Sequence, residues 1–338
     1  MLRWILDDTR ALLDDLRAFL VHVTRRWRWF RIRSRQRVGR AGADLENVRR
    51  SARSTTRMCA ACRALIPAAA RICPECGHSP GPRVSQGVAR VIEGMMPGFV
   101  SVSSGILTAN VLLYALSLFV WTHIHDVLPS NAQGAAWNVA LIAMGGNVPA
   151  LVAEGEVWRL LTSVFLHGGL LHILFNSWAL LTVGPLVEEL YGARRFVVLY
   201  VVTGGCASLA SALWRAGSWG PGIGASGALV GLIGVAAVWG WRRGGSLGEG
   251  IKGQMVQWAI YVLVLGFLFR FDNAAHIGGM VSGAFLGLVL GDRGSSRAKT
   301  EPLWEVAAWV CGLACVGCFL MVGLGYDATL SRIFQGLP

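Results

Sequence analysis

The stretch GASGALVGLIGVAAVWG at residues 224–240, read together with AHIGGMVSGAFLG at residues 275–287, decides the fold. Both stretches are apolar and carry glycines four positions apart, which are Gly227, Gly231, Gly279, Gly283 and Gly287. Residues four apart lie on one face of a helix, and faces of small residues let the backbones of membrane helices approach closely. The sequence therefore predicts two closely packed helices inside a membrane.

The remainder of the chain also has the composition of a membrane protein. Hydrophobic residues make up 54% and charged residues 15%, against about 25% charged residues in a typical globular protein. A helix needs roughly 20 apolar residues to cross the hydrocarbon core. Candidate spans lie near residues 104–122, 169–190, 196–214, 226–241, 254–270, 273–290 and 304–325. We therefore predict an all-α polytopic membrane protein with six closely connected spans and a seventh after a charged break.

Basic residues are unevenly distributed along the chain and predict its orientation. Residues 1–100 hold 19 Arg against 8 acidic residues, and the short loops after the second, fourth and sixth spans are basic. Because such loops stay in the cytoplasm, we expect a multi-pass protein of a bacterial inner membrane with a cytoplasmic N-terminus and an outer C-terminus. The N-terminal charge is expected to meet anionic membrane lipid and no nucleic acid, since no base-reading motif accompanies it.

Changes in composition divide the chain into five regions. Residues 1–55 are a basic region that begins with an amphipathic helix and continues with an Arg- and Trp-rich segment. That segment either lies on an anionic membrane surface or is a solvated basic linker. We expect a cysteine module at 56–80, a Gly-, Pro- and Ser-rich linker at 81–101, a core of six spans at 102–292, and the charged break with the seventh span at 293–338.

The cysteine module contains two Cys-x-x-Cys pairs, Cys59 with Cys62 and Cys73 with Cys76. Two such knuckles supply four thiolates in the tetrahedral arrangement of structural Zn²⁺, and a cytoplasmic location argues against disulfides. The module resembles a small zinc ribbon; rubredoxin-like iron is the alternative, and His78 is a candidate extra ligand. We expect it to fold only with metal bound, to take no part in catalysis, and to have a partner that the sequence does not name.

Two of the predicted spans carry a candidate nucleophile and a candidate base. Ser226 lies between small residues at the start of a span, so its hydroxyl is approachable and unpaired backbone N–H groups lie nearby. A serine hydroxyl is a weak nucleophile that needs a base, and close packing of the fourth and sixth spans could bring His276 to it. Taken singly, Ser226 could be only a helix cap, and His276 only a polar contact within the bundle.

The second span carries two further polar side chains, His172 and Asn176, with His167 just before it. Positions 172 and 176 share one face of a helix. An imidazole N–H and an amide are both donors that can stabilise an oxyanion. Polar groups within membrane spans are functional candidates by default, although hydrogen bonding between helices would explain either residue taken singly.

Several segments, taken in order, resemble those of the rhomboid proteases. They are EVWR at 156–159, FLH at 165–167, HILFN at 172–176, GASG at 224–227, and AH at 275–276 with the glycines that follow it. Gly184, Glu188 and Gly192 match the family pattern at the end of the second span. The resemblance covers roughly residues 104–291. It implies a six-helix rhomboid-type bundle, to which this chain adds a seventh C-terminal transmembrane helix and the preceding four-cysteine zinc ribbon.

The resemblance also implies the catalytic roles. Ser226 and His276 would form a dyad that needs no cofactor, and the backbone N–H of Ser226 would join His172 and Asn176 in an oxyanion hole. Some family members have an aromatic residue four positions after the nucleophile, packed on the histidine. Here that position is Val230, and no acidic residue is well placed to orient His276, so other contacts must do so.

Two loops complete the picture that the resemblance implies. Trp158 and Arg159 would belong to a first loop that lies partly in the outer leaflet. The glycines of the exposed segment 217–224 would give a flexible approach to the nucleophile.

The sequence thus predicts an intramembrane serine endopeptidase that cleaves transmembrane protein substrates near the outer membrane boundary. The alternative is a non-catalytic protein on the same scaffold that binds membrane clients. Such proteins typically lack the serine or the histidine, whereas this chain has both. A transporter is disfavoured because broken inverted repeats are not evident, and a zinc metalloprotease because the chain has no His-Glu-x-x-His motif.

Overall fold

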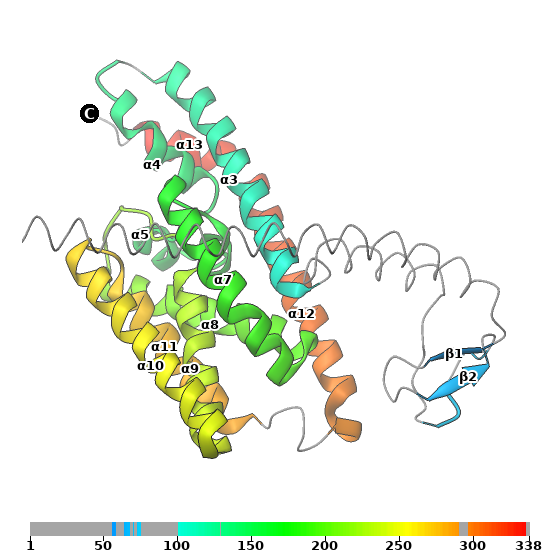
Figure 1. Ribbon diagram of the computed structural model, residues 1–338. Helices are drawn as coiled ribbons and strands as arrows, with labels where there is room; N and C mark the ends of the chain where they lie inside the picture. Colours follow the sequence, from blue (N-terminus) through cyan, green and yellow to red (C-terminus); the bar gives the residue numbers. More distant parts are fainter. Residues whose placement is uncertain are drawn as a thin grey trace, which may run out of the picture. The chain divides into compact units, whose positions relative to one another are not determined.

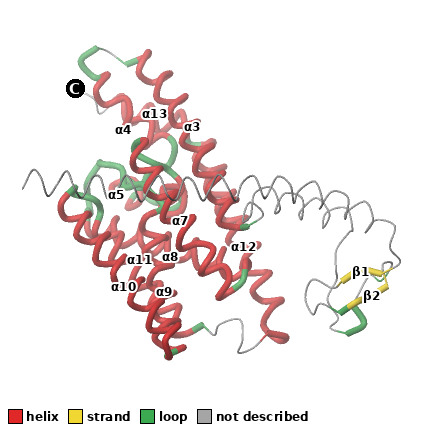
Figure 2. The backbone as a smooth tube through the Cα atoms, in the orientation of Figure 1, coloured by secondary structure: helices red, strands yellow, loops and turns green. Residues whose placement is uncertain are grey.

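The computed structural model describes residues 56–58, 64–67, 70, 73–75, 101–128, 130–290 and 297–335. The chain divides into two compact units, Met1–Val100 and Ser101–Pro338. Strands are drawn in the first unit and helices dominate the second, as the colours of Figure 2 show.

The described part of the first unit is a short β-hairpin. Strand β1 (Thr56–Met58) pairs antiparallel with β2 (Leu65–Pro67), and Arg57 lies opposite Ile66. Ile66 and Cys73 are buried together, each 1% exposed. Cys59 and Cys62 fall in the sequence between the two strands, and Cys76 follows β2; all three lie outside the described residues.

The second unit confirms the prediction of an all-α helical bundle, because each of the seven predicted spans is a helix. Their bounds are α3 Val102–Val127, α7 Leu170–Tyr191, α8 Ala193–Trp214, α9 Ser226–Arg243, α10 Gly245–Leu268, α11 Asn273–Val289 and α12 Arg297–Leu324. Helix α10 begins earlier than predicted, since it continues through a polar turn around Glu249 and Lys252. In Figure 1, α10 lies on the left of the bundle and α3 and α12 on the right.

Five of these helices are long and apolar enough to cross a membrane; α9 and α11 are shorter or less apolar. At 1.5 Å per residue, the 18 residues of α9 rise about 27 Å, slightly less than the hydrocarbon core of about 30 Å. Helix α9 packs against α7, α8, α10 and α11, and its residues Gly227–Ala236 are all buried. The enclosed helix begins at Ser226, which is itself half-buried.

The predicted glycine faces of α9 and α11 meet. A methyl group added at Gly279 would collide with the carbonyl oxygen of Gly227, and one added at Gly283 with that of Gly231. Only glycine permits this backbone approach, so the small-residue spacing fixes how the helix that begins at Ser226 packs on the helix that carries His276.

A long first loop between α3 and α7 contains short helical elements. They are η1 Gln133–Ala135, α4 Ala136–Ala143, α5 Pro149–Ala153, α6 Arg159–Thr162 and η2 Ser163–Phe165. Arg159 is only 2% exposed. Its guanidinium pairs with Glu156 at 2.7 Å and donates to the carbonyl oxygens of Ile142 at 2.6 Å and Gly146 at 3.1 Å. This buried arginine holds the loop in one conformation.

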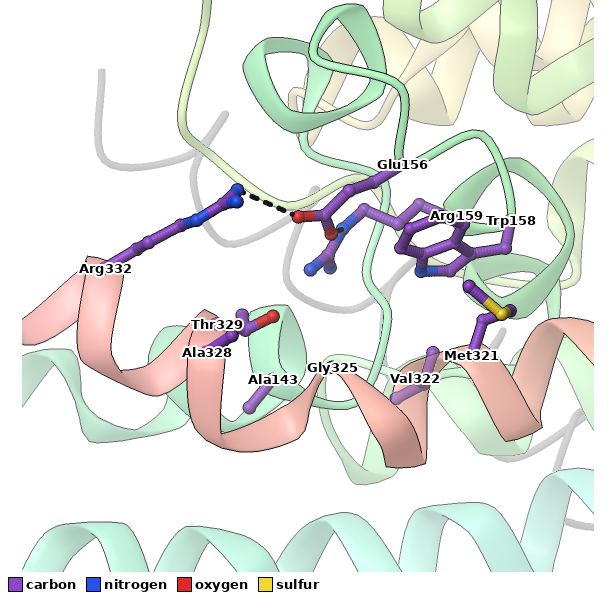
Figure 3. A pocket seen from close by; sticks show the side chains of 10 residues that line it. All are labelled: Ala143, Glu156, Trp158, Arg159, Met321, Val322, Gly325, Ala328, Thr329 and Arg332. Atoms are coloured by element: carbon purple, nitrogen blue, oxygen red, sulfur yellow. Dashed lines mark hydrogen bonds and ion pairs between the residues drawn. The ribbon is translucent and has the colours of Figure 1, made fainter.

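The C-terminal helices pack on the first loop. Helix α12 contacts α6 and α8, and α13 (Tyr326–Gln335) contacts α4. Arg332 forms ion pairs with Glu154 at 3.3 Å and Glu156 at 3.2 Å, so that Arg332, Glu156 and Arg159 make a continuous chain of charges beside a cavity of about 170 Å³ (Figure 3). The segment after the sixth span therefore supports the loop that precedes the second.

Candidate active site

The structure brings Ser226 and His276 together. Ser226 is the first residue of α9, and His276 lies in the first turn of α11. His276 Nε2 is 3.0 Å from Ser226 Oγ, and the histidine side chain is buried, with 3% of the residue exposed. This is hydrogen-bond distance for a hydroxyl and an imidazole nitrogen, the relation that an activated serine requires.

Sequence reasoning did not identify the residue that holds the other side of the imidazole. Asn273 Oδ1 lies 3.1 Å from His276 Nδ1, and Asn273 Nδ2 donates to the carbonyl oxygen of Leu263 on α10 at 3.2 Å. Position 273 is three residues before His276 on the same helix, a spacing that puts both side chains on one face. That spacing is the sequence feature from which a contact between Asn273 and His276 could have been predicted. Val230, which stands where some family members have an aromatic residue, is buried at 2% exposure.

His172 and Asn176 converge next to the nucleophile. The backbone N–H of Gly168 donates to His172 Nδ1 at 3.3 Å, so the proton of the neutral ring lies on Nε2. A methyl group added at Gly224 would lie 2.7 Å from His172 Nε2 and 3.8 Å from Asn176 Nδ2. Asn176 is buried, and its Nδ2 has no hydrogen-bond partner among the described residues. Two N–H donors therefore face the backbone two residues before Ser226.

His167 lies behind His172 and not in the site. It is completely buried, and the two rings meet edge to face with centroids 5.3 Å apart. Burial lowers the pKa of His167 to about 3, and the neighbouring His172 contributes in the same direction. Since neither ring nitrogen has a hydrogen-bond partner of good geometry within the described part of the chain, His167 acts as a neutral packing group for His172.

The segment before Ser226 was expected to be a flexible approach, but the structure fixes it at several points. Gly222 and Asn147 exchange backbone hydrogen bonds of 2.9 and 2.8 Å, and the Gly224 N–H donates to Ser163 O at 2.9 Å. These bonds attach the segment to the first loop. The glycines serve close approach here: Gly224 adopts φ +122°, a left-handed conformation that disfavours other residues, directly against the His172 ring.

An arginine ties the same segment to the helix of the base. Arg215, just after α8, donates to Gly220 O at 2.9 Å, and its Nε lies 3.5 Å from an Asp272 carboxylate oxygen. Asp272 also accepts from the Ser211 hydroxyl, and its other oxygen caps α11 by accepting from the Ala275 N–H at 3.0 Å. This network connects the approach to Ser226 with the helix start that carries His276.

Comparisons with known proteins find similarity over the part of the chain that carries this site. The family model of the Rhomboid domain matches residues 154–293, the segment that contains Ser226, His276, His172 and Asn176. Residues 154–293 are thus similar to a rhomboid domain. The findings support the rhomboid family for this chain and a multi-pass membrane protein.

Relatives of the rhomboid domain occur in bacteria, plants and protozoa. The chain is 37% identical over 178 residues to "Rhomboid protease GluP" of Bacillus subtilis (strain 168), covering 52% of this chain and 34% of that protein. It is 40% identical over 156 residues to "RHOMBOID-like protein 5" of Arabidopsis thaliana, covering 41% and 46%. It is 29% identical over 224 residues to "Rhomboid-like protease 2" of Toxoplasma gondii, covering 63% and 73%. The chain thus spans less than half of the first two. Two of these three proteins are named as proteases.

The predicted metal site of the cysteine module falls mostly outside the described residues. Of its four ligands only Cys73 is described, buried against Ile66. Within the described ranges, no group of three or more His, Cys, Asp or Glu side chains is placed to hold a metal ion. The zinc ribbon stays a prediction.

Proposed function

We propose that this chain is an intramembrane serine endopeptidase that cleaves transmembrane protein substrates with a dyad of Ser226 and His276. The observation that carries the proposal is the 3.0 Å contact between Ser226 Oγ and His276 Nε2, with half-buried His172 and buried Asn176 from α7 beside it. A hydroxyl, a base and a donor pair at one point are the requirements of acyl transfer.

Each residue has a defined role in the proposed reaction. Ser226 Oγ attacks the scissile carbonyl carbon while His276 Nε2 accepts the hydroxyl proton. The carbonyl oxygen becomes an oxyanion, held by His172 Nε2–H, Asn176 Nδ2–H and the backbone N–H of Ser226, which is free at a helix N-terminus.

When the peptide C–N bond breaks, His276 gives its proton to the leaving amine. Water then attacks the acyl carbon and gives a proton to His276, which passes it to Ser226 Oγ as the acyl–Oγ bond breaks and the new carboxyl end leaves. The reaction needs no cofactor, because proton transfer and charge stabilisation both come from these side chains.

The distribution of charge supports a site that opens to the outer side. The first loop is joined to the segment before Ser226, and residues 123–157 contain no Lys or Arg. The other end of α9 carries Arg242 and Arg243. Basic residues favour the cytoplasmic side, so the N-terminus is proposed inside, the site near the outer boundary and the C-terminus outside, in a bacterial inner membrane.

The competing proposal is a non-catalytic rhomboid-like protein that binds membrane clients. A paired serine and histidine argue against it, since client binding requires neither. The test uses purified protein in liposomes with a model transmembrane substrate and follows cleavage by mass spectrometry. Ser226→Ala and His276→Ala should abolish cleavage, whereas the control Ser117→Ala, a buried serine on α3 bonded to Leu113 O at 2.8 Å, should retain it. Cleavage that survives Ser226→Ala would refute the dyad.

For the first unit we propose a structural zinc site formed by Cys59, Cys62, Cys73 and Cys76. The support is the β-hairpin that flanks Cys59 and Cys62 and the burial of Cys73, since a knuckle at a hairpin turn is the usual frame of such sites. Metal analysis of the purified chain should find zinc and little iron. A Cys59→Ser/Cys76→Ser variant with unchanged metal content would contradict the proposal.

A further inference from the structure

We infer that Asn273 is a positioning residue for His276, and that it makes the orientation of the base dependent on helix α10. The inference rests on the proposed function, because it concerns how the base of that reaction is held. Its starting point is the bond of 3.1 Å between Asn273 Oδ1 and His276 Nδ1, on the side of the ring opposite Ser226.

The second bond of Asn273 fixes which way its amide points. A backbone carbonyl only accepts hydrogen bonds, so the atom that faces Leu263 O at 3.2 Å must be the amide NH₂. The atom that faces His276 is therefore the amide oxygen, which also only accepts. His276 Nδ1 must then carry the ring proton, and Nε2 must present its lone pair to the Ser226 hydroxyl. This is the tautomer that a general base requires.

Helix α10 packs against the side chain of Asn273. A methyl group added at Gly266 would collide with Asn273 Oδ1 and lie 3.1 Å from Nδ2. Gly266 lies in the last turn of α10, and its carbonyl oxygen accepts from the Phe271 N–H at 2.8 Å. Arg270, between them, has φ 56°, an unfavourable conformation for a residue other than glycine. One tight turn thus connects α10 to α11 and places Asn273, the first residue of α11, against the last turn of α10.

The base is therefore connected to α10 through the side chain of Asn273. Two ionisable groups interact electrostatically with the ring, Asp272 at the cap of its own helix and His172 on α7; Asp272 is itself paired with Arg215 of the α8 end. Among the described residues, it is Asn273 and neither of these groups that hydrogen-bonds His276 Nδ1. Displacement of the α10 end would move Asn273 and leave the imidazole free to rotate or change tautomer.

The test compares four variants and one control variant in the liposome cleavage assay. Asn273→Ala should lower kcat on the order of 10²-fold with KM nearly unchanged, as expected for a misplaced catalytic group. Asn273→Asp keeps an acceptor for Nδ1–H, so it should recover activity relative to alanine. Its carboxylate stabilises the imidazolium, so the acid limb of its kcat/KM profile should move to higher pH.

Gly266→Ala should reproduce the loss of Asn273→Ala, and the double variant should lose little more, because both changes remove the same contact. The matched control is Gly253→Ala on the same helix, where an added methyl group meets nothing within 4 Å and cleavage should be unaffected. Asn273→Ala with wild-type kcat would overturn the inference. The inference would also be overturned if Asn273→Asp were no more active than Asn273→Ala and the acid limb of its kcat/KM profile stayed at the wild-type pH. This second result decides the question even if Asn273→Ala folds poorly.

Failure of the inference can be told from failure of the proposed function. If cleavage survives Ser226→Ala or His276→Ala, the dyad itself is wrong. If cleavage depends on both residues but ignores Asn273 and Gly266, the dyad stands and only the positioning role fails.

Discussion

Replacing Gly279 by alanine should separate the two helices that carry the dyad. The added methyl group would collide with the carbonyl oxygen of Gly227, a backbone atom that cannot rotate away. Carbon and oxygen in contact need more than about 3 Å, so α9 and α11 must move apart by roughly 1 Å. The Ser226–His276 distance of 3.0 Å would lengthen by a similar amount and leave hydrogen-bond range.

Two quantities follow from that displacement. A misplacement of about 1 Å can lower the rate about 10²-fold, so kcat/KM should fall by this order. Overpacking a close interface lowers the free energy of unfolding by about 1–3 kcal/mol, which should lower the melting temperature in detergent. Cleavage of a transmembrane substrate in liposomes and thermal unfolding measure the two effects separately.

The matched control is Gly317→Ala on α12. A methyl group there meets nothing within 4 Å, and alanine is the better helix former by about 1 kcal/mol, so both stability and cleavage should be kept or improved. If Gly279→Ala cleaves as fast as wild type and melts at the same temperature, the close approach of α9 and α11 is wrong.

Three further predictions concern other parts of the site and its support. Asn176→Ala should lower kcat about 10²–10³-fold with little change in KM, because an oxyanion donor acts in the transition state; initial-rate kinetics measure it, and a pure KM effect would contradict the role. His167 has a folded pKa of about 3, below its ordinary value of 6.5, so the unfolded state binds more protons and stability falls as pH drops from about 6.5 towards 3. His167→Phe should flatten the fall in melting temperature over that range, and an unchanged pH slope would show that the ring is not buried neutral. Arg332→Glu should lower the melting temperature only modestly, since each partly exposed ion pair contributes about 0–1 kcal/mol. Arg332→Glu with Glu154→Arg should restore part of it, because the swap re-forms the pair with position 154 and leaves a like-charge contact with Glu156; a swap that repairs none of the loss would mean that α13 is held by other contacts.

The arrangement of α9 and α11 could be predicted because it depends on glycines that recur every four residues in the sequence. Glycines at positions 227, 231, 279 and 283 specify which faces can approach, and the packing then places Ser226 and His276 near one another. The convergence of His172 and Asn176 was predictable for the same reason, since i and i+4 positions share a face.

Other parts of the site depend on contacts that no repeating sequence pattern predicts. Asn273 is a polar residue at the start of a helix, where capping is the simpler expectation, and its role depends on Gly266 seven positions away in another helix. Arg332 meets Glu154 across 178 positions of sequence. The segment 217–224 looked flexible from its glycines, yet backbone bonds to the first loop fix it. Such contacts follow from the path of the chain in space and not from local pattern.

The central claim is that His276 activates Ser226 as the nucleophile. The most direct measurement is covalent labelling of the purified protein in detergent with a fluorophosphonate, followed by intact-mass analysis and peptide mapping. The account predicts one adduct, located on Ser226, that forms in the wild type and in Ser117→Ala but is lost in His276→Ala. An adduct on another residue, or labelling of Ser226 at the wild-type rate in His276→Ala, would contradict the claim.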